Sequence, residues 1–232
     1  MDRRSADVLR TVSDPAWPHI QALIEASPDH VEVVSTARSR RDAALEALQV
    51  TVGSFLGALV GECGALLVDH GWLRILASGA NGLPGVHEAN VLNGEPPPLL
   101  EVAWDVLGGR FAINGGGLDA PTGDICYWGP DTLDWCPIGG GHADLITWAL
   151  SGGPSDFYAA LRWPGWEQEV TVVPVDHGLS LVPPPFTVQG RDVATTHRAA
   201  VPTGERQRFY ADMSRQLGDT PDGSAFNLTI TE

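Results

Sequence analysis

The stretch LLEVAWDVLGGRFAINGGGLD, residues Leu99 to Asp119, decides the fold class of this chain. Its apolar runs LLEVAWDVL and RFAIN are typical of strands, and Gly108 and Gly109 join them. The three glycines that follow lead to the turn residues Pro121 and Gly123, and no helix starts there, so the spacing excludes a dinucleotide-binding fingerprint. We therefore expect these glycines to bend the backbone between antiparallel strands and not to hold a phosphate.

The segments on either side extend this pattern in both directions. Gly57, Gly61, Gly64 and Gly71 argue against one long helix between residues 55 and 79, and four prolines between residues 81 and 98 predict a loop. Alternation and turn residues predict strands at 30–35, 64–69, 72–77 and 178–182 and a hairpin about the turn Gly129–Thr132. Helical spacing predicts helices at 14–27, 39–50, 142–152 and 203–218, with one or two more between 154 and 170.

Helices, then mostly strands, then helices follow one another along the chain. This order predicts an α+β fold with a central, mainly antiparallel sheet flanked by N-terminal and C-terminal helices. The composition shows no linker, so we expect one domain over residues 1–182. Residues 183–232 are expected to form a C-terminal extension with one helix packed on that domain, and the polar tail after Asp219 is expected to be loosely held.

The charge balance restricts the partners. The 232 residues carry a formal net charge of −15, which argues against binding to nucleic acid or to an anionic membrane surface and suits a basic or neutral partner. All 14 basic residues are arginines. The absence of lysine excludes pyridoxal-phosphate enzymes, ordinary P-loops and protein kinases.

Other motifs of common cofactor and metal sites are also missing. Cys63, Cys126 and Cys136 form no CxxC pair and are expected to be small buried side chains. Neither GxSxG nor HExxH occurs, and the histidines do not pair at metal-ligand spacing, so we expect no cofactor and no metal, with a site assembled from distant segments as the alternative. No segment has the apolar length of a membrane helix or a signal peptide, which predicts a cytoplasmic protein.

Four residues are candidates for acid–base catalysis if the chain is an enzyme. The sequence DHGW places Asp69 beside His70, and an aspartate can orient an imidazole, but a turn stabilised by the Asp69 side chain explains the pair equally well. Asp105 ends a predicted strand. His142 follows three glycines and opens a helix, where exposed amides favour an anion, and a flexible start of the helix is the simpler explanation.

Tryptophan, arginine and aspartate supply the candidates for binding. The chain has eight tryptophans, of which some must be core, and RWPGW places two of them beside an arginine at a Pro-Gly break. Trp and Arg dominate binding hot spots, and an acidic aromatic surface attracts cations. The binding candidates are Trp72, Arg74, Asn114, Trp128, Asp131, Asp134, Trp135, Arg162, Trp163 and Trp166, and core packing with a solvated hairpin tip is the alternative for these residues.

Six segments carry a resemblance to a known family. They are DPAWPHIQ, ALEALQVT, LLVDHGWLRILASG, VLGGRFAINGGGL, YWGPDTLDW and FYAALRWPGWEQEV, which resemble in this order the bacterial domain of unknown function 2625. NGGG after an apolar strand, PDTLDW in a hairpin and the helix HADLITWAL are more faintly similar to the SUKH superfamily. That likeness implies an α+β protein of the immunity type, which binds a protein partner.

Three functions remain open from the sequence. The first is a protein-binding module of the immunity or partner-binding type, which engages a protein through its sheet and acidic hairpin, with a basic partner expected. The second is an enzyme that acts on a small organic substrate in a Trp-lined pocket with His and Asp as acid and base. The third is a structural subunit without a pocket. A deep pocket that gathers a histidine, a carboxylate and aromatic rings would favour the enzyme.

Overall fold

The computed structural model describes residues 3–92 and 97–218, and within them seven strands form one antiparallel sheet, which we call the main sheet. The strands are hydrogen-bonded in the order β1-β2-β3-β6-β7-β8-β9, so chain neighbours are mostly sheet neighbours. Their bounds are β1 (Val31–Val34), β2 (Ala65–Val68), β3 (Leu73–Leu76), β6 (Leu99–Asp105), β7 (Arg110–Asn114), β8 (Ile125–Trp128) and β9 (Trp135–Pro137).

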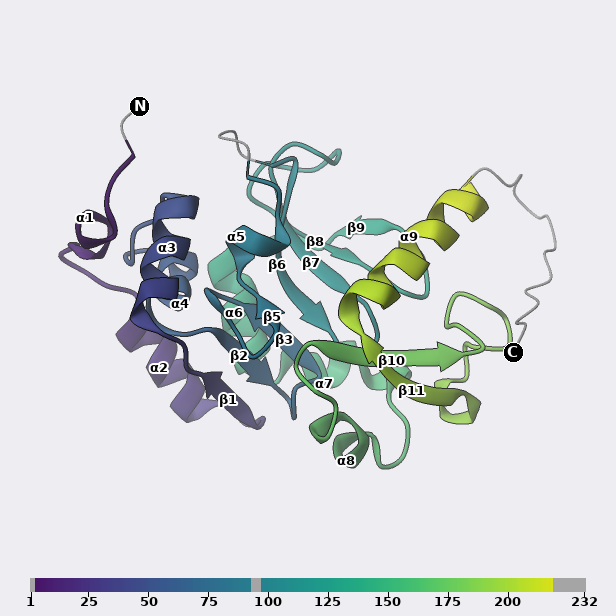
Figure 1. The fold of residues 1–232 in the computed structure, drawn as a ribbon. Coiled ribbons are helices and arrows are strands. Elements are labelled where there is room, and N and C mark those ends of the chain that lie inside the picture. The colour runs from purple at the N-terminus through teal and green to yellow at the C-terminus, as the bar shows by residue number, and fades with distance from the viewer. Residues whose placement is uncertain (1–2, 93–96, 219–232) are drawn as a thin grey trace.

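Helices cover one face of the main sheet. Phe111 of β7 is fully buried on this face, with its ring centroid 5.9 Å from that of Trp148 and 6.0 Å from that of Phe157. Helix α6 contacts α2 and α4 as well, and Figure 1 shows the N-terminal helices together at the left of the sheet. The helices of this layer are α1 (Ala6–Arg10), α2 (Trp17–Ala26), α3 (Arg38–Leu48), α4 (Phe55–Glu62), α6 (His142–Leu150) and α7 (Gly153–Phe157).

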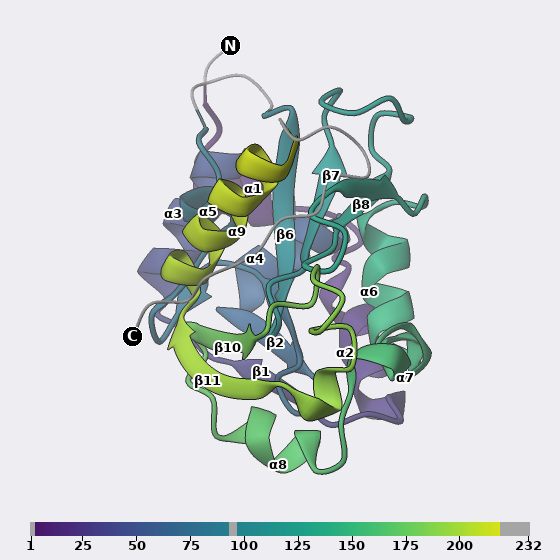
Figure 2. The same ribbon diagram turned by 90° about the vertical axis from the view of Figure 1, so that its right-hand side faces the viewer.

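The C-terminal elements cover the opposite face. Tyr210 packs on Trp128 at a ring separation of 5.7 Å, and the Leu179 N–H donates to the Val106 carbonyl over 2.7 Å. Figure 2 looks onto this face, with β10, β11 and α9 in front of the main sheet. The elements are β10 (His177–Val182), which pairs with β11 (His197–Pro202), and α9 (Thr203–Gly218). The pairing joins residues on both sides of the boundary expected at residue 182.

Short elements complete the fold. They are β4 (Gly79–Ala80), β5 (Leu83–Pro84), α5 (Val86–Ala89), the 3-10 turns η1 (Ala159–Leu161) and η2 (Val193–Thr195), and α8 (Trp166–Thr171).

Among the described residues, no helix has the length and apolar character needed to cross a membrane.

The predicted α+β fold with a central antiparallel sheet is confirmed, and the strand predictions around it agree with the structure. Several details differ. The first predicted helix begins at Trp17, not at Asp14, and has Pro18 in its first turn. The predicted loop at residues 81–98 contains β5 and α5, and β11 was not predicted. The prediction for the tail after Asp219 lies outside the described residues.

Helix α4 was missed because its glycines argue against a helix. The structure gives the reason for these glycines. A Cβ on Gly57 would lie 1.9 Å from the backbone oxygen of Thr51, and a Cβ on Gly61 would lie 2.9 Å from Val52. Only glycine permits this close packing, and the hydroxyl of Ser54 caps the helix by accepting from the Gly57 N–H over 3.0 Å. Close packing of α4 on the loop that precedes it therefore overrides the low helix propensity of glycine.

The glycines of the opening stretch bend the backbone, as expected. Gly108 has φ of 111°, a left-handed conformation that favours glycine. The turn also binds an anion of its own, because Oδ1 of Asp105 accepts from the N–H groups of Leu107, Gly108 and Gly109 over 2.9, 2.8 and 2.8 Å. The amides of this turn therefore serve a carboxylate of the same chain.

Candidate binding surface

A line of directly opposite residues crosses all strands of the main sheet on the face under the C-terminal elements. Opposite residues in paired strands point to the same side, so these side chains share one face. We call this line the cross-strand row, and it consists of Glu32, Leu67, Arg74, Trp104, Arg110, Trp128 and Trp135. Three of the predicted binding residues, Arg74, Trp128 and Trp135, therefore lie on a common surface of the sheet.

An irregularity in β6 adds a carboxylate to this face. The register shifts between Glu101 and Ala103, which is a β-bulge, so Glu101 lies opposite Ala112 while Trp104 lies opposite Arg110. Both side chains consequently point to the same side. The indole N–H of Trp104 donates to Glu101 over 2.8 Å, and the Arg110 guanidinium donates to the same carboxylate over 2.8 Å.

Arg110 joins this carboxylate to the hairpin at the end of the row. Its guanidinium carbon lies 4.6 Å from the ring centroid of Trp128 and 5.2 Å from that of Trp135, which is cation–π geometry. Asp131 and Asp134 are exposed at the hairpin tip, and Asp134 accepts from the Trp135 N–H over 2.8 Å. The predicted acidic hairpin is thus built on an Arg–Trp stack.

A second cluster forms at the turn between β2 and β3. Asp69 and His70 have φ of 55° and 59°, an uncommon conformation for residues other than glycine. The buried Asp69 carboxylate pairs with the guanidinium of Arg162. Burial raises the pKa of Asp69, and the positive charge of Arg162 opposes this rise. We call Asp69, His70, Trp72, Arg162 and Trp166 the turn cluster.

Aromatic rings surround the arginine of the turn cluster. The guanidinium carbon of Arg162 lies 4.2 Å from the ring centroid of Trp166 and 5.2 Å from that of Trp72. Trp72 is fully buried, whereas Trp166 is half-buried. His70 meets the edge of Trp166 at 6.0 Å and stacks on His30 at 5.3 Å. Five of the predicted residues, from two distant segments, are therefore brought together.

An open groove runs along the outer side of the turn cluster. Its volume is about 400 Å³. Trp163 is almost fully buried below it, with its ring 4.4 Å from the guanidinium carbon of Arg198, so core packing explains this predicted residue. The groove is lined by Arg162, Trp163, Pro164, Gly165, Trp166, Glu167 and Gln168.

Asp105 and Asn114, like His142 below, do not join these surfaces. Asp105 is buried, and its second oxygen accepts from the Tyr127 hydroxyl over 2.9 Å, so both of its oxygens are engaged. Asn114 is fully buried and orders the following loop, with its amide donating to the Ala120 carbonyl over 2.8 Å and its oxygen accepting from the Gly116 N–H over 3.0 Å. Both residues have structural contacts that account for their positions.

His142 lies at the opposite end of the main sheet from His70. His70 follows the end of β2, which pairs with the start of β3, whereas His142 follows β9, whose end pairs with the start of β8. Both ring nitrogens of His142 are buried without a hydrogen-bond partner among the described residues, and burial lowers its pKa to about 4. The two histidines therefore do not form a common acid–base site.

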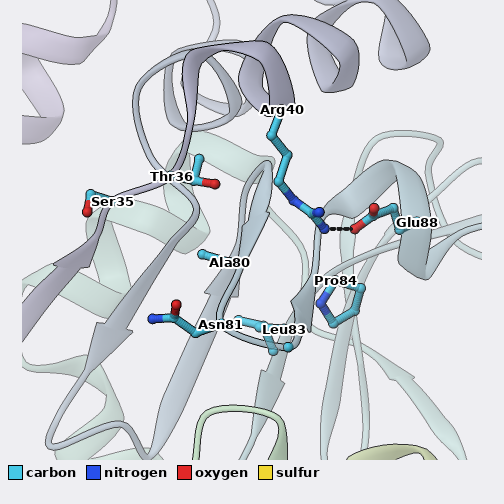
Figure 3. Close-up of a pocket in the computed structure, with 9 residues that line it drawn as sticks. Ser35, Thr36, Arg40, Ala80, Asn81, Leu83, Pro84 and Glu88 are labelled. Atoms are coloured by element: carbon cyan, nitrogen blue, oxygen red, sulfur yellow. Dashed lines mark hydrogen bonds and ion pairs between the residues drawn. The ribbon is translucent and has the colours of Figure 1, made fainter.

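Sequence reasoning missed another groove, of about 620 Å³, beside the β4–β5 turn. Figure 3 shows Arg40 of α3 reaching the Glu88 carboxylate of α5 across it, with which it forms an ion pair. Asn81, with φ of 53°, lies in the turn itself, and Leu83 begins β5. No signal in the sequence links Arg40 to Glu88, because Glu88 falls in a segment predicted as loop.

Metal ligation finds no support in this part of the molecule. Within residues 3–92 and 97–218, no group of three or more His, Cys, Asp or Glu side chains is arranged to hold a metal ion. Cys63, Cys126 and Cys136 carry free thiols, of which Cys136 is exposed, contrary to the expectation that all three are buried.

Comparison with known proteins agrees with the segments that suggested a family. Residues 7–206 match the protein family of unknown function DUF2625. The chain belongs to this family. A putative uncharacterized protein of Escherichia coli K12, YbfG, is similar to this DUF2625 chain, with 36% identity over 182 residues that cover 78% of this chain and 84% of YbfG.

An uncharacterized protein of Haemophilus influenzae is similar over a longer range. It is 32% identical over 219 residues, which cover 92% of this DUF2625 chain and 95% of the relative. No solved structure matches the chain. The fainter likeness to the SUKH superfamily stays a prediction.

Proposed function

We propose that this member of DUF2625 is a cytosolic protein-binding module, and that it engages a basic protein partner through the groove beside the turn cluster. The observation that carries the proposal is the half-buried ring of Trp166, which lines an open groove and stacks on Arg162. Tryptophan and arginine are the residues most enriched in binding hot spots. A ring held by its neighbours loses little entropy when a partner covers it.

Charge supports the choice of a basic partner. The chain carries a formal net charge of −15, and Asp69 pairs with Arg162, so the guanidinium in the groove wall is compensated. Glu167 lines the same groove and is exposed. Asp131 and Asp134 of the hairpin are also exposed, at the far end of the cross-strand row. Such a field attracts a basic partner and speeds its association.

The placement of the catalytic candidates favours binding over turnover. The carboxylate of Asp69 is held by Arg162, and that of Asp105 by backbone amides and Tyr127. His142 lies at the other end of the sheet with buried ring nitrogens. The free thiols fit a reducing compartment, and the likeness to SUKH immunity proteins fits a binding role.

A comparison of variants tests this function. We expect the wild-type protein, used as bait in a lysate of its own bacterium, to retain one basic protein in stoichiometric amount. Trp166→Ala removes the ring and Glu167→Arg reverses the charge, so each should weaken retention at least tenfold, which corresponds to about 1.4 kcal/mol. Quantitative mass spectrometry of the eluate measures retention.

The matched control changes an exposed apolar residue on the other side of the sheet. Val8 of α1 is 53% exposed, and Val8→Ser should retain the partner as the wild type does. The proposed function is refuted if no stoichiometric partner is recovered, or if the partner is retained equally by Trp166→Ala and Glu167→Arg.

A further inference from the structure

Arg74 is a buried cation without a carboxylate partner. Its exposed fraction is 2%, and among the described residues no acidic side chain lies within ion-pair distance of its guanidinium, whereas Arg10, Arg110 and Arg162 each have one. Burial lowers the pKa of Arg74 to about 10, so the group stays charged at neutral pH. Buried charges are normally paired, because the loss of hydration is costly.

Backbone carbonyls satisfy only part of this guanidinium. Nε donates to the Gly71 carbonyl over 3.2 Å, and Nη1 donates to the carbonyls of Val175 and His177. The second amino group, Nη2, has no hydrogen-bond partner among the described residues. These bonds fix the orientation of the guanidinium. They leave the Nη2 amino group as a hydrogen-bond donor and the positive charge available for a ligand.

This guanidinium lines a small cavity of about 140 Å³ on the face of the cross-strand row. Four segments supply its other polar side chains. They are His30 and Glu32 at β1, His70, whose ring stacks on His30 at 5.3 Å, Asn81 in the β4–β5 turn, and Thr171 of α8. The Thr171 hydroxyl already donates to the Glu167 carbonyl over 2.7 Å. The rest of the wall is apolar, since the cavity is also lined by Val34, Leu67, Val170, Val173 and Val175.

The lining selects the chemistry of the ligand. Imidazole and amide groups beside a guanidinium donate hydrogen bonds to an oxyanion. The valine side chains would contact a short alkyl chain, which inorganic phosphate lacks. The exposed carboxylate of Glu32 at the same cavity opposes a second negative charge and thereby favours a monoanion. A volume of about 140 Å³ is close to that of five waters in the liquid, at about 30 Å³ each, and suits a chain of few carbons.

We propose that this cavity binds a small aliphatic monocarboxylate, with Arg74 and the stacked pair His30–His70 holding the carboxylate and the valines holding the alkyl chain. This site is distinct from the groove of the proposed function, because none of the residues from Arg162 to Gln168 lines it. His70 of the cavity contacts Trp166 of the groove, but butyrate binding and partner retention are separate measurements, so either proposal can fail without the other.

Titration calorimetry on the full-length protein tests the site with butyrate as the probe. Inorganic phosphate and butylamine serve as comparison ligands, because the first lacks the alkyl chain and the second carries the opposite charge. We expect saturable binding of butyrate and at least tenfold weaker binding of both comparison ligands. No saturable binding of butyrate, or equal affinity for phosphate or butylamine, overturns the proposal.

Variants at exposed positions give the sharpest test, because they spare the core. Glu32→Gln removes the opposing charge and should tighten butyrate binding about fivefold, whereas His30→Leu removes a donor and should weaken it about fivefold. His197→Leu, at an exposed histidine of β11, should leave binding unchanged. Arg74→Leu should abolish butyrate binding, but this variant can also unfold. The result for Glu32→Gln and His30→Leu therefore decides the test. Unchanged affinity in both Glu32→Gln and His30→Leu overturns the assignment.

Discussion

The carboxylate of Asp105 occupies an anion-binding turn that its own chain forms. Three backbone N–H groups reach one oxygen and the Tyr127 hydroxyl reaches the other. A ligand would have to displace a buried side chain to use these amides, at the cost of leaving a charge unpaired. From the sequence, such a residue is a candidate for catalysis. Only the contacts of its side chain in the folded protein show that its role is structural.

His142 gives a prediction for the dependence of stability on pH. Burial lowers its pKa to about 4, whereas an imidazole in the unfolded chain has a pKa of about 6.5. The unfolded chain therefore binds a proton at a higher pH than the folded chain does. The contribution to stability is complete above about pH 6.5 and is lost as the pH falls toward 4.

We expect His142→Leu to remove this loss. Between pH 7 and pH 5 the wild type should lose about 2 kcal/mol more of its free energy of unfolding than the variant loses. Urea unfolding at the two pH values measures the difference, and His197→Leu, at an exposed histidine, should behave as the wild type does. Equal losses in the wild type and His142→Leu would contradict the prediction.

Glycine has opposite roles in two helices of this fold. In α4, a Cβ on Gly57 would lie 1.9 Å from the Thr51 oxygen, so the missing side chain lets the helix pack on the loop that leads into it. In α9, a Cβ on Gly204 would meet nothing within 4 Å. The same residue type is thus required in one helix and dispensable in the other.

Alanine substitutions should separate these two roles. We expect Gly57→Ala to lower the free energy of unfolding by about 1–3 kcal/mol, because overpacking outweighs the better helix propensity of alanine. Gly204→Ala should raise it by up to about 1 kcal/mol, since the unfolded chain loses freedom and nothing clashes. Thermal unfolding of both variants provides the measurement, and a stabilised Gly57→Ala would show that α4 can move aside.

The elements that could be predicted are those whose pattern is local. The apolar run RFAIN and the turn residues between Trp128 and Trp135 predicted the strands that the structure shows as β7, β8 and β9. Helix α4 could not be predicted, because its glycines are explained only by contacts with Thr51 and Val52. Local pattern is therefore sufficient where an element packs by its own apolar face, and insufficient where close backbone approach decides.

The candidate surface was predictable only as a set of residue types. The sequence indicated Trp166, Arg162 and Asp69 but not their contact, because that contact depends on how the chain packs after residue 150. Arg110 and Glu101 were not selected at all. Their pairing requires the β-bulge of β6 and the register of β6 on β7, and neither can be derived from alternation alone.

At the scale of the whole molecule, acidic side chains outnumber basic ones, and the excess negative charge acts on the folded chain as a whole. A formal net charge of −15 on 232 residues means that folding brings many like charges closer together. Ion pairs such as Arg10–Asp42 and Arg198–Glu169 offset part of this repulsion locally. The remaining repulsion acts over distances at which dissolved salt is an effective screen.

Salt should therefore stabilise the folded protein. Raising NaCl from about 0.02 to 0.3 M should increase the free energy of unfolding by about 1 kcal/mol, which raises the melting temperature by about 2–4 °C for a chain of this size. Differential scanning calorimetry measures the shift. The variant Asp131→Asn/Asp134→Asn, which removes two exposed negative charges, should show a smaller shift. A melting temperature that falls with salt would contradict the prediction.

The bulge in β6 makes the length of this strand critical. Loss or gain of one residue between Glu101 and Trp104 would turn one of the two side chains to the helix layer and would break the contact of Glu101 with Trp104. Substitutions along this strand can accumulate during evolution, but single-residue deletions and insertions cannot do so without rebuilding both layers. Alignments of relatives should accordingly keep this interval free of gaps.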